Sequence, residues 1–522
     1  MIASSRPKPW SRLVVEAGLT RGWHGLADPA IVSVVEDSRK VQPGCCFVAR
    51  RGERTDGHAY VAQAVAAGAA AIVCERDVDG ADGVAVLKVA DATGAAGRLA
   101  AVLTGLADIQ RAGRLDVVGI TGTNGKSTTC YLLRAILERA GHSTALLGTV
   151  QYDLLSRTIA AERTTPALSE LISYLAEAAG AGARHAVMEV SSHALDQRRC
   201  EGVRFSVGVF TNLTRDHLDY HETMDAYLKA KKKLFDSLDP RATAVVNAHS
   251  PAAATVVADC RAPVVRYGIV GDSLACGDGG AEVPDVAARI DAMAAHGTRF
   301  ELRLGPRLTR GSGGRPATAA VDLALIGRHN VLNALAAGGA AAALGVGIET
   351  IAAGLRDVAF VPGRLQRVSG GADDLNVLVD YAHTDDALDN VLSALRPLVA
   401  GRLILVFGCG GQRDVKKRPM MAAAVARYAD AIVVTSDNPR GEDPQAIIDD
   451  ILAGFSADAM DRVLVEPDRR RAIAWAIGMA GPEDVVLLAG KGHETYQEIG
   501  DRRIAFDDAV VAREVLEARL AC

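Results

Sequence analysis

A glycine-rich segment with one lysine stands between a predicted strand at 115–120 and a predicted helix. Backbone N–H groups of such a loop, with the positive end of the helix, can hold phosphate groups; a lysine there reaches the β and γ oxygens and a serine can ligate Mg²⁺. A standard P-loop has glycine at the position that corresponds to 120, where this chain has Ile120. The simpler alternative is a tight turn with an exposed lysine. The segment is Gly122, Thr123, Asn124, Gly125, Lys126, Ser127, Thr128 and Thr129.

Three further residues could take part in phosphate chemistry. Glu189 stands near the end of an apolar run at 186–190, where a carboxylate could hold Mg²⁺ beside Ser127. Taken alone, it is more simply a strand-end salt bridge. His217 lies in a polar turn, where a lone histidine is usually a surface residue, and Lys231 lies in a lysine run that is typical of a solvated helix face.

Apolar runs alternate with helical patterns along most of the chain, which predicts an α/β fold with parallel sheets. The segment 268–325 breaks this rhythm with glycine-rich loops at 277–280 and 311–314, and we expect an insertion or a sheet edge there. We predict three domains, at 1–109, 110–359 and 360–522. Strands are expected at 31–35, 46–48, 70–73, 84–89, 115–120, 186–190, 207–210, 244–246, 377–379, 403–407, 431–434 and 485–488, with helices at 60–67, from 127 and at 330–356.

The composition excludes several classes of protein. A chain of 522 residues with 49% hydrophobic and 23% charged residues is typical of a globular protein of several domains. Its net charge of −5 and low aromatic content argue against nucleic-acid binding, and no apolar run is long enough for membrane insertion. The nine scattered cysteines form no Cys-x-x-Cys pair, which favours a reducing cytoplasm over disulfides or zinc. Nothing indicates an obligatory protein partner.

The glycine-rich loop and five later motifs together resemble the Mur ligases, over nearly the whole chain and in the same order. These are MEVSSH at 188–193, TNL at 211–213, RDHLDYH at 215–221, GRHN at 327–330 and DYAHT at 380–384. The resemblance implies a small N-terminal UDP-binding domain, a central P-loop-type ATPase domain and a C-terminal Rossmann-like domain. The family usually has proline after that threonine, where this chain has Asp385.

The resemblance also implies roles for single residues. Glu189 and His217 would ligate metal with Ser127. Lys231 would be carbamylated and help to hold a second Mg²⁺. Lys232 and Lys233 are the alternative positions for the carbamylated lysine. Catalysis would rest on Lys126, Glu189, His217 and Lys231. ATP would contact Gly122, Thr123, Asn124, Gly125, Lys126, Ser127, Thr128, Asn330, Arg364, Asp380 and His383.

Two further sets of residues match substrate positions in the resembling family. Ser38, Thr164, Thr165, Ser191, Gln197 and Arg199 would hold UDP-N-acetylmuramoyl-L-alanyl-D-glutamate. Arg413, Asp437, Asn438, Pro439, Arg440, Gly490 and Glu494 would hold meso-2,6-diaminopimelate. This amino acid is lysine with an added distal carboxylate, which an arginine fork suits; without the resemblance, residues 437–440 would be an ordinary turn.

We therefore expect an ATP-dependent, ADP-forming ligase that adds meso-2,6-diaminopimelate to the UDP-muramyl dipeptide through an acyl phosphate, in peptidoglycan precursor synthesis. The nearest alternative is a lysine-adding ligase of the same family, which Arg440 disfavours. A folylpolyglutamate synthase would share the ATP loop without the uridine-end motifs. A P-loop regulatory switch would be favoured by a base-reading Asn-Lys-x-Asp motif, which the sequence lacks.

Overall fold

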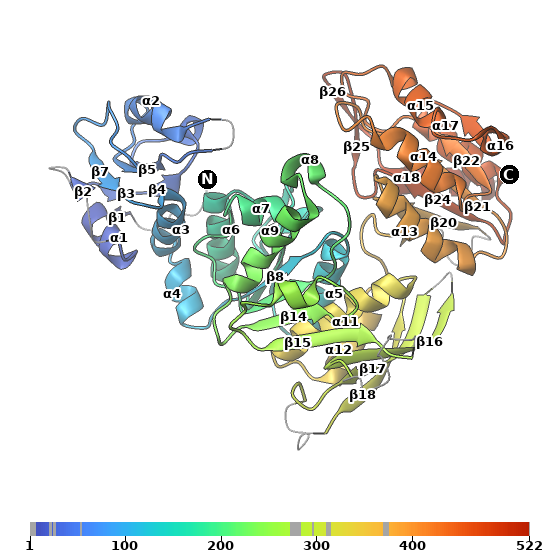
Figure 1. The fold of residues 1–522 in the computed structure, drawn as a ribbon, viewed down its shortest axis with the longest axis horizontal. Helices are drawn as coiled ribbons and strands as arrows, with labels where there is room; N and C mark the ends of the chain where they lie inside the picture. The colour runs from blue at the N-terminus through green and yellow to red at the C-terminus, as the bar shows by residue number, and fades with distance from the viewer. Residues whose placement is uncertain are drawn as a thin grey trace.

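The computed structural model describes residues 7–19, 23–24, 28–52, 55–271, 283–294, 297–309, 315–368 and 375–520. Three α/β units, each built on its own sheet, lie in a row along the molecule (Figure 1). The α/β class with parallel sheets is confirmed. The sheets fall inside the three ranges expected as domains, although the boundaries themselves stay a prediction. Within the described residues, every helix is too short or too polar to cross a bilayer.

The N-terminal unit has a five-stranded sheet in the order β2-β7-β6-β5-β4. The strand expected at 31–35 is divided in two, because β3 pairs with β1 in a separate ribbon while β4 joins the main sheet. The elements are β1 (Lys8–Pro9), α1 (Trp10–Glu16), β2 (Trp23–His24), β3 (Ala30–Ile31), β4 (Ser33–Val35), β5 (Cys45–Val48), α2 (Val61–Ala66), β6 (Ala71–Cys74), β7 (Ala85–Lys88), α3 (Ala92–Leu103) and α4 (Leu106–Arg111), with 3₁₀ turns at Ser38–Lys40 and Gly57–Tyr60.

The central unit has eleven strands in the order β11-β10-β9-β12-β8-β13-β14-β15-β16-β17-β18. Its middle strands are parallel, and β16, β17 and β18 form an antiparallel edge, as expected for the segment 268–325, whose loops at 277–280 and 311–314 lie outside the described residues. The strands are β8 (Asp116–Thr121), β9 (Thr144–Leu147), β10 (Gln151–Asp153), β11 (Thr158–Ala160), β12 (His185–Glu189), β13 (Val207–Phe210), β14 (Thr243–Asn247), β15 (Val264–Ile269), β16 (Val286–Ala294), β17 (Gly297–Leu304) and β18 (Ala317–Leu323).

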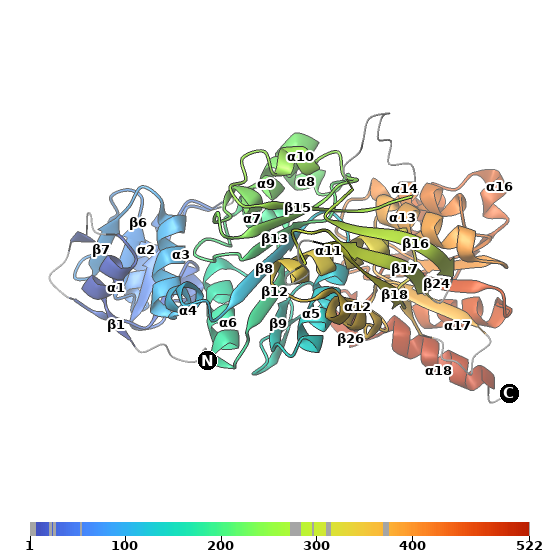
Figure 2. The same ribbon diagram turned by 90° about the horizontal axis from the view of Figure 1, so that it is seen from below.

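Helices cover both faces of the central sheet (Figure 2). The helix expected from residue 127 begins one residue earlier, and Gly141, with φ of +82°, follows its end in the left-handed conformation that commonly terminates helices. The helices are α5 (Lys126–Arg139), α6 (Leu168–Gly180), α7 (Ser192–Asp196), α8 (Leu218–His221), α9 (Met224–Asp236), α10 (Ala253–Val256), α11 (Arg328–Ala343) and α12 (Ile348–Arg356).

The C-terminal unit has a six-stranded sheet in the order β19-β20-β24-β21-β22-β23, parallel except for β19, with helices on both faces. The elements are β19 (Gln366–Arg367), β20 (Asn376–Asp380), α13 (Asp385–Leu395), β21 (Leu403–Phe407), α14 (Lys417–Ala426), β22 (Ala431–Val434), α15 (Pro444–Leu452), α16 (Ala457–Met460), β23 (Val463–Val465), α17 (Arg469–Met479), β24 (Val485–Ala489), β25 (Tyr496–Ile499), β26 (Arg502–Ala505) and α18 (Asp508–Leu520), with a 3₁₀ turn at Arg396–Leu398.

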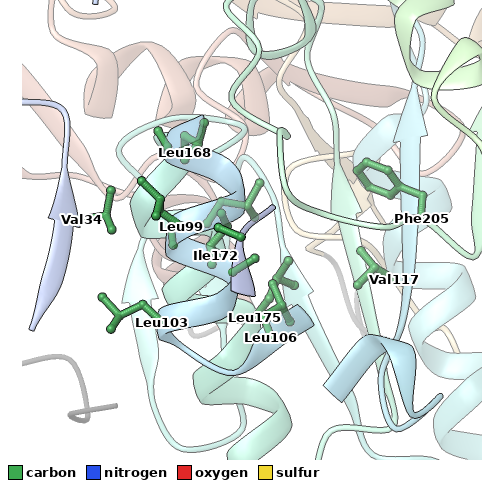
Figure 3. Packing of buried hydrophobic residues seen from close by; sticks show 14 of the residues in the cluster. Val34, Leu99, Leu103, Leu106, Val117, Leu168, Ile172, Leu175 and Phe205 are labelled. Atoms are coloured by element: carbon green, nitrogen blue, oxygen red, sulfur yellow. The ribbon is translucent and has the colours of Figure 1, made fainter. Parts of the chain in front are cut away.

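One hydrophobic cluster spans the N-terminal and central units, in addition to a cluster within each of them. Figure 3 shows Leu99 and Leu103 of α3 beside Ile172 and Leu175 of α6, all of them buried. Gly97 of α3 lies so close to the loop after α7 that an added Cβ would come within 2.6 Å of the Glu201 backbone. Burial of this apolar surface therefore holds the two units together.

At the start of β12, His185 is buried, and its Nε2 lies 2.8 Å from Nδ1 of the half-buried His142. Burial lowers the pKa of His185 to about 4, from an ordinary value of 6.5. Between these values the unfolded chain binds a proton at this position that the folded chain does not, so the contribution of His185 to stability is lost as pH falls.

We expect His185→Phe, which removes the titrating ring and keeps its bulk, to weaken the acid sensitivity of the fold. The thermal midpoint of the variant should fall less than that of wild type between about pH 7 and pH 5. His142→Ala is the control, because it leaves the buried His185 in place and should retain the wild-type pH dependence. An equal fall in wild type and His185→Phe would contradict the assignment.

Candidate active site

The glycine-rich loop joins β8 to α5 at the carboxyl edge of the central sheet, where β8 lies between β12 and β13. Gly122 and Gly125 have φ of +153° and +85°, and a Cβ on Gly125 would lie 2.3 Å from Oδ1 of Asn333. Lys126 Nζ donates to the carbonyls of Gly122 and Thr123, at 3.0 and 2.7 Å. Burial lowers the pKa of this lysine. The tight turn that the sequence predicts is present, with the lysine folded over the loop rather than exposed.

The loop lines a cavity of about 810 Å³ that also involves the C-terminal unit. Arg364, from the connection into that unit, donates to Ser127 Oγ at 3.2 Å. The expected nucleotide and metal residues that line this cavity are Thr123, Asn124, Gly125, Lys126, Ser127, Thr128, Glu189, His217, Asn330, Arg364, Asp380 and His383. Asp380 is buried and uses its two oxygens to accept from the N–H groups of Leu365 and Ala382, so it shapes the loop around the cavity.

Glu189 ends β12 with its carboxylate buried beside the loop. Thr149 holds this carboxylate through its N–H to Oε1 at 2.8 Å and its hydroxyl to Oε2 at 3.1 Å. Thr149 was not singled out from the sequence. Its position two residues after β9, at the same sheet edge as Glu189, is the signal that could have identified it.

The three adjacent lysines of α9 have different environments. Lys231 is almost completely buried, with Nζ 4.2 Å above the ring of Tyr227, and burial lowers its pKa well below the ordinary value. Lys232 pairs with Asp236 and Asp259, and Lys233 with Asp196, at the surface. Among the described residues Lys231 has no carboxylate in ion-pair range. Only Lys231 is therefore directed inward, toward Lys126 and His217, whose charges interact with it.

Most residues expected to bind the UDP-linked substrate lie together beside Glu189. Thr165 Oγ1 donates to the Glu189 carbonyl at 2.9 Å and accepts from the Ser191 N–H at 3.0 Å. Arg199 donates to the Thr165 carbonyl and to Gln197 Oε1, and Thr164 contacts Thr149 through their hydroxyls. Ser38 lies apart from this group, in the first 3₁₀ turn of the N-terminal unit.

The residues expected to bind the amino acid gather at the carboxyl edge of the C-terminal sheet. Asn438 Nδ2 donates to Glu494 Oε2 at 2.7 Å, and a Cβ on Gly490 would lie 2.7 Å from Asp437 Oδ2. Arg440, which follows Pro439, donates to Glu498 and to the Gly411 carbonyl. Arg413, which is exposed, and Arg440, which is partly buried, both approach Gly410.

His493 connects this cluster to the central unit. It lies close to the Thr149 backbone, and its ring lies 4.9 Å from that of Tyr381. Because Thr149 also holds Glu189, the segment 490–494 lies beside the buried carboxylate at the glycine-rich loop. The two clusters are parts of one site that spans both units.

Comparison with known proteins accounts for all three units. The sequence matches the family descriptions "Mur ligase family, catalytic domain" at residues 30–115, "Mur ligase middle domain" at 120–341 and "Mur ligase, glutamate ligase domain" at 363–492. A relative from Geobacillus kaustophilus, named UDP-N-acetylmuramoyl-L-alanyl-D-glutamate--2,6-diaminopimelate ligase, is 43% identical and covers 95% of this chain and 97% of its own. The chain belongs to the Mur ligase family.

Other Mur ligases agree with this assignment. A relative of the same name from Gloeobacter violaceus is 44% identical over 95% of each chain. A solved structure with that name has a TM-score of 0.69 at 30% identity, covering 98% of this chain and 99% of its own. A folylpolyglutamate synthase from Mycobacterium tuberculosis complexed with ADP shares the fold, with a TM-score of 0.57 at 20% identity over 81% of this chain and 92% of its own. The predicted family and the enzyme class, a ligase, are confirmed.

The departure from the Mur ligase pattern at Asp385 fits the local structure. Thr384 caps α13 by accepting from the Ala387 N–H, which places Asp385 at the first helical position. Proline is favoured there, and a negative charge is stabilised by the helix dipole. The next residue, Asp386, was not singled out from the sequence. It accepts from Asn124 at 3.5 Å and Thr214 at 3.1 Å, which joins α13 to the glycine-rich loop.

We expect Gly125→Ala to weaken ADP binding at least about tenfold, because its Cβ displaces Asn333 and shifts the loop. Gly141→Ala is a matched control: it imposes a similar strained φ, +82°, at a glycine whose Cβ would meet nothing within 4 Å. Titration calorimetry should give an ADP affinity for the control within about twofold of wild type. Unchanged affinity in Gly125→Ala would show that the loop tolerates a Cβ.

Proposed function

We propose that this Mur ligase joins meso-2,6-diaminopimelate to UDP-N-acetylmuramoyl-L-alanyl-D-glutamate with consumption of ATP. The observation that carries the proposal is the contact of the His493 ring with Tyr381, because Tyr381 lines the same cavity as the glycine-rich loop and His493 lies next to Glu494 of the acidic and arginine-rich cluster. The names of relatives 43–44% identical over 95% of the chain support the same substrates. The seven described cysteines are all free thiols, which supports the predicted cytoplasmic location.

The reaction requires two steps at adjacent positions. A carboxylate oxygen of the dipeptide attacks the γ-phosphorus of ATP, ADP leaves, and an acyl phosphate forms. The amine of the amino acid then attacks the acyl carbon, loses a proton and displaces phosphate. The first step develops charge on phosphate oxygens, which Lys126 and the N–H groups of the loop would stabilise, while Arg364 holds Ser127 at the same edge.

The polar groups around the loop fit Mg²⁺. The buried carboxylate of Glu189 and the hydroxyl of Ser127 line the same cavity as His217, and a lysine carbamate would add two more oxygens. The residues that would hold two ions are Ser127, Glu189, His217 and carbamylated Lys231. When bound, Mg²⁺ neutralises charge on the transferring phosphoryl group.

Lys231 has the properties that carbamylation requires. Burial lowers the pKa of Lys231 and so favours its neutral amine, which is the form that attacks CO₂, forming an N–C bond and releasing a proton. Lys232 and Lys233 are instead paired with carboxylates at the surface. These environments support Lys231, rather than its two neighbours, as the carbamylated lysine.

The two substrates would occupy the polar clusters on either side of Glu189. Thr164, Thr165, Ser191, Gln197 and Arg199 would hold the muramyl dipeptide, while Ser38 would contact the uridine end. Asp437 and Glu494 would receive the ammonium groups of diaminopimelate, with Asn438, Pro439 and Gly490 shaping the pocket. Arg413 and Arg440 would bind the distal carboxylate, which lysine lacks.

A panel of amino acids tests the proposed function. The purified enzyme, supplied with ATP, Mg²⁺ and the UDP-muramyl dipeptide, should release ADP rapidly with meso-2,6-diaminopimelate and slowly with lysine. Preference for lysine would identify the alternative Mur ligase activity. ADP release that needs no amino acid would indicate a nucleotide switch instead.

We expect Lys231→Ala to lose most of its activity, on the order of 100-fold or more, and to be partly rescued by a short-chain carboxylic acid that fills the position of the carbamate. Lys232→Ala is the control and should behave as wild type, because that lysine contacts only surface carboxylates. Intact-protein mass spectrometry at raised CO₂ should detect one added CO₂ in wild type and none in Lys231→Ala. Equal loss of activity in both variants without rescue would contradict the carbamate.

We expect Arg440→Ala to lower kcat/KM for diaminopimelate on the order of 100-fold while changing kcat/KM for lysine much less. Arg440→Lys should not restore the discrimination, because an ammonium group cannot form two parallel bonds to a carboxylate. Both variants are assayed with both amino acids. A similar decrease for the two amino acids in Arg440→Ala would mean that the segment 437–440 does not select the substrate.

A further inference from the structure

Lys491 follows β24 and is completely buried, with an exposed fraction of 0%. Its Nζ lies 3.2 Å from Oδ1 of Asn438 and 3.2 Å from Oε2 of Glu494, and 5.6 Å from the centre of the Tyr496 ring. Burial of a lysine is costly, so such residues are rare unless they are paired. Here the partners of the lysine are two residues of the proposed amino-acid pocket.

The contacts of Lys491 fix the orientation of the Asn438 side chain. Oδ1 of Asn438 accepts from Lys491 and from the Glu498 N–H at 3.0 Å, while Nδ2 donates to Glu494 at 2.7 Å. If the Asn438 amide were rotated by half a turn, its NH₂ group would face two other donors, Lys491 Nζ and the Glu498 N–H. Lys491 therefore fixes the orientation of Asn438, and it also contacts Oε2 of Glu494.

Lys491 also determines the charge balance around Glu494. The other charged or titratable groups that interact with Glu494 are Asp437 after β22, Arg469 on α17 and Tyr381 after β20. Arg469 forms a buried two-bond pair with Asp508, which neutralises most of its charge. Burial and Asp437 raise the pKa of Glu494, and Lys491 is the cation in direct contact that lowers it.

We propose that Lys491 is a positioning residue of the amino-acid pocket, which orients Asn438 and keeps Glu494 ionised so that it can receive an ammonium group of the amino acid. The inference rests on the proposed function, because it takes Glu494 as the group that binds the amino acid. Lys491 itself contacts only protein groups within the described residues.

The test is the pH dependence of KM for meso-2,6-diaminopimelate in Lys491→Met, with ATP and the UDP-muramyl dipeptide saturating. Without the lysine, Glu494 should take up a proton at a higher pH, so as the pH falls KM should begin to rise at a higher pH than in wild type. We expect KM to increase up to about tenfold in the acid range where Glu494 is protonated in the variant and still ionised in wild type, with kcat and the KM for the UDP-muramyl dipeptide changed much less. Lys491→Arg should restore most of the wild-type profile.

Arg402→Met is the matched control. Arg402 pairs with the largely buried Asp484 at the opposite edge of the same sheet, so its replacement removes a cation of the C-terminal unit without touching the pocket. Its KM profile should match that of wild type. An unshifted profile in Lys491→Met, or the same shift in Arg402→Met, would overturn the proposal.

Glu494→Gln makes the test independent of the folding of Lys491→Met. The Glu494→Gln variant should lose the acid-dependent rise in KM. In the double variant Glu494→Gln with Lys491→Met both charges are removed, so neither is left unpaired. Its pH profile of KM should match that of Glu494→Gln alone. Persistence of the rise in Glu494→Gln would overturn the inference. Failure of wild type to use diaminopimelate would instead reject the proposed function, so the two failures are distinguishable.

Discussion

The parallel pairing of β8 with β12 and β13 is the constraint on which the whole site depends. Glu189 is in register with Ile120, and Phe210 with Thr121, so the chain leaves all three strands at the same sheet edge. The glycine-rich loop and the Glu189 carboxylate therefore meet there. A shift of one residue in this register would turn the Glu189 side chain to the other face of the sheet and remove it from the loop.

Close backbone approach is the second requirement of the site. A Cβ at Gly122 would lie 1.8 Å from Oγ1 of Thr211, and at Gly363 it would lie 2.3 Å from the N–H of His493. Both glycines have positive φ. The first lets the loop fold over the strand ends, and the second lets the connection that carries Arg364 lie against the segment 490–494 of the C-terminal unit. The same physical property thus serves the glycine-rich loop and the packing of this connection.

The units differ in how they are attached. Apolar side chains of α3 and α6 form a shared core between the N-terminal and central units. The C-terminal unit meets the site mainly through polar contacts, from Arg364 to Ser127, Asp386 to Thr214 and His493 to Thr149. Polar contacts of this kind are individually weak, so ligands that bridge the two units would contribute a large share of the stability of their closed arrangement.

Much of the fold could be predicted from the sequence, because strand formation depends on local apolar runs. The strands expected at 207–210 and 431–434 match β13 and β22, and the end of α5 was marked by Gly141. The prediction of a single strand at 31–35 was wrong, because its two halves pair with different strands, β1 and β5, that lie elsewhere in the chain. The short strands β19 and β23 carried no signal strong enough to stand out.

The sequence by itself determined which chemical groups this protein has, and in what order: a glycine-rich loop with a lysine, a carboxylate at a strand end, a lysine run and an Asp-Asn-Pro-Arg turn. Only the tertiary structure decided which of them act together. It separates Lys231 from Lys232 by burying one face of α9, and it seats Glu189 on Thr149, forty residues away in the chain. The reason is physical: residue types and local spacing fix reactivity and secondary structure, whereas burial and hydrogen-bond partners depend on contacts between distant segments.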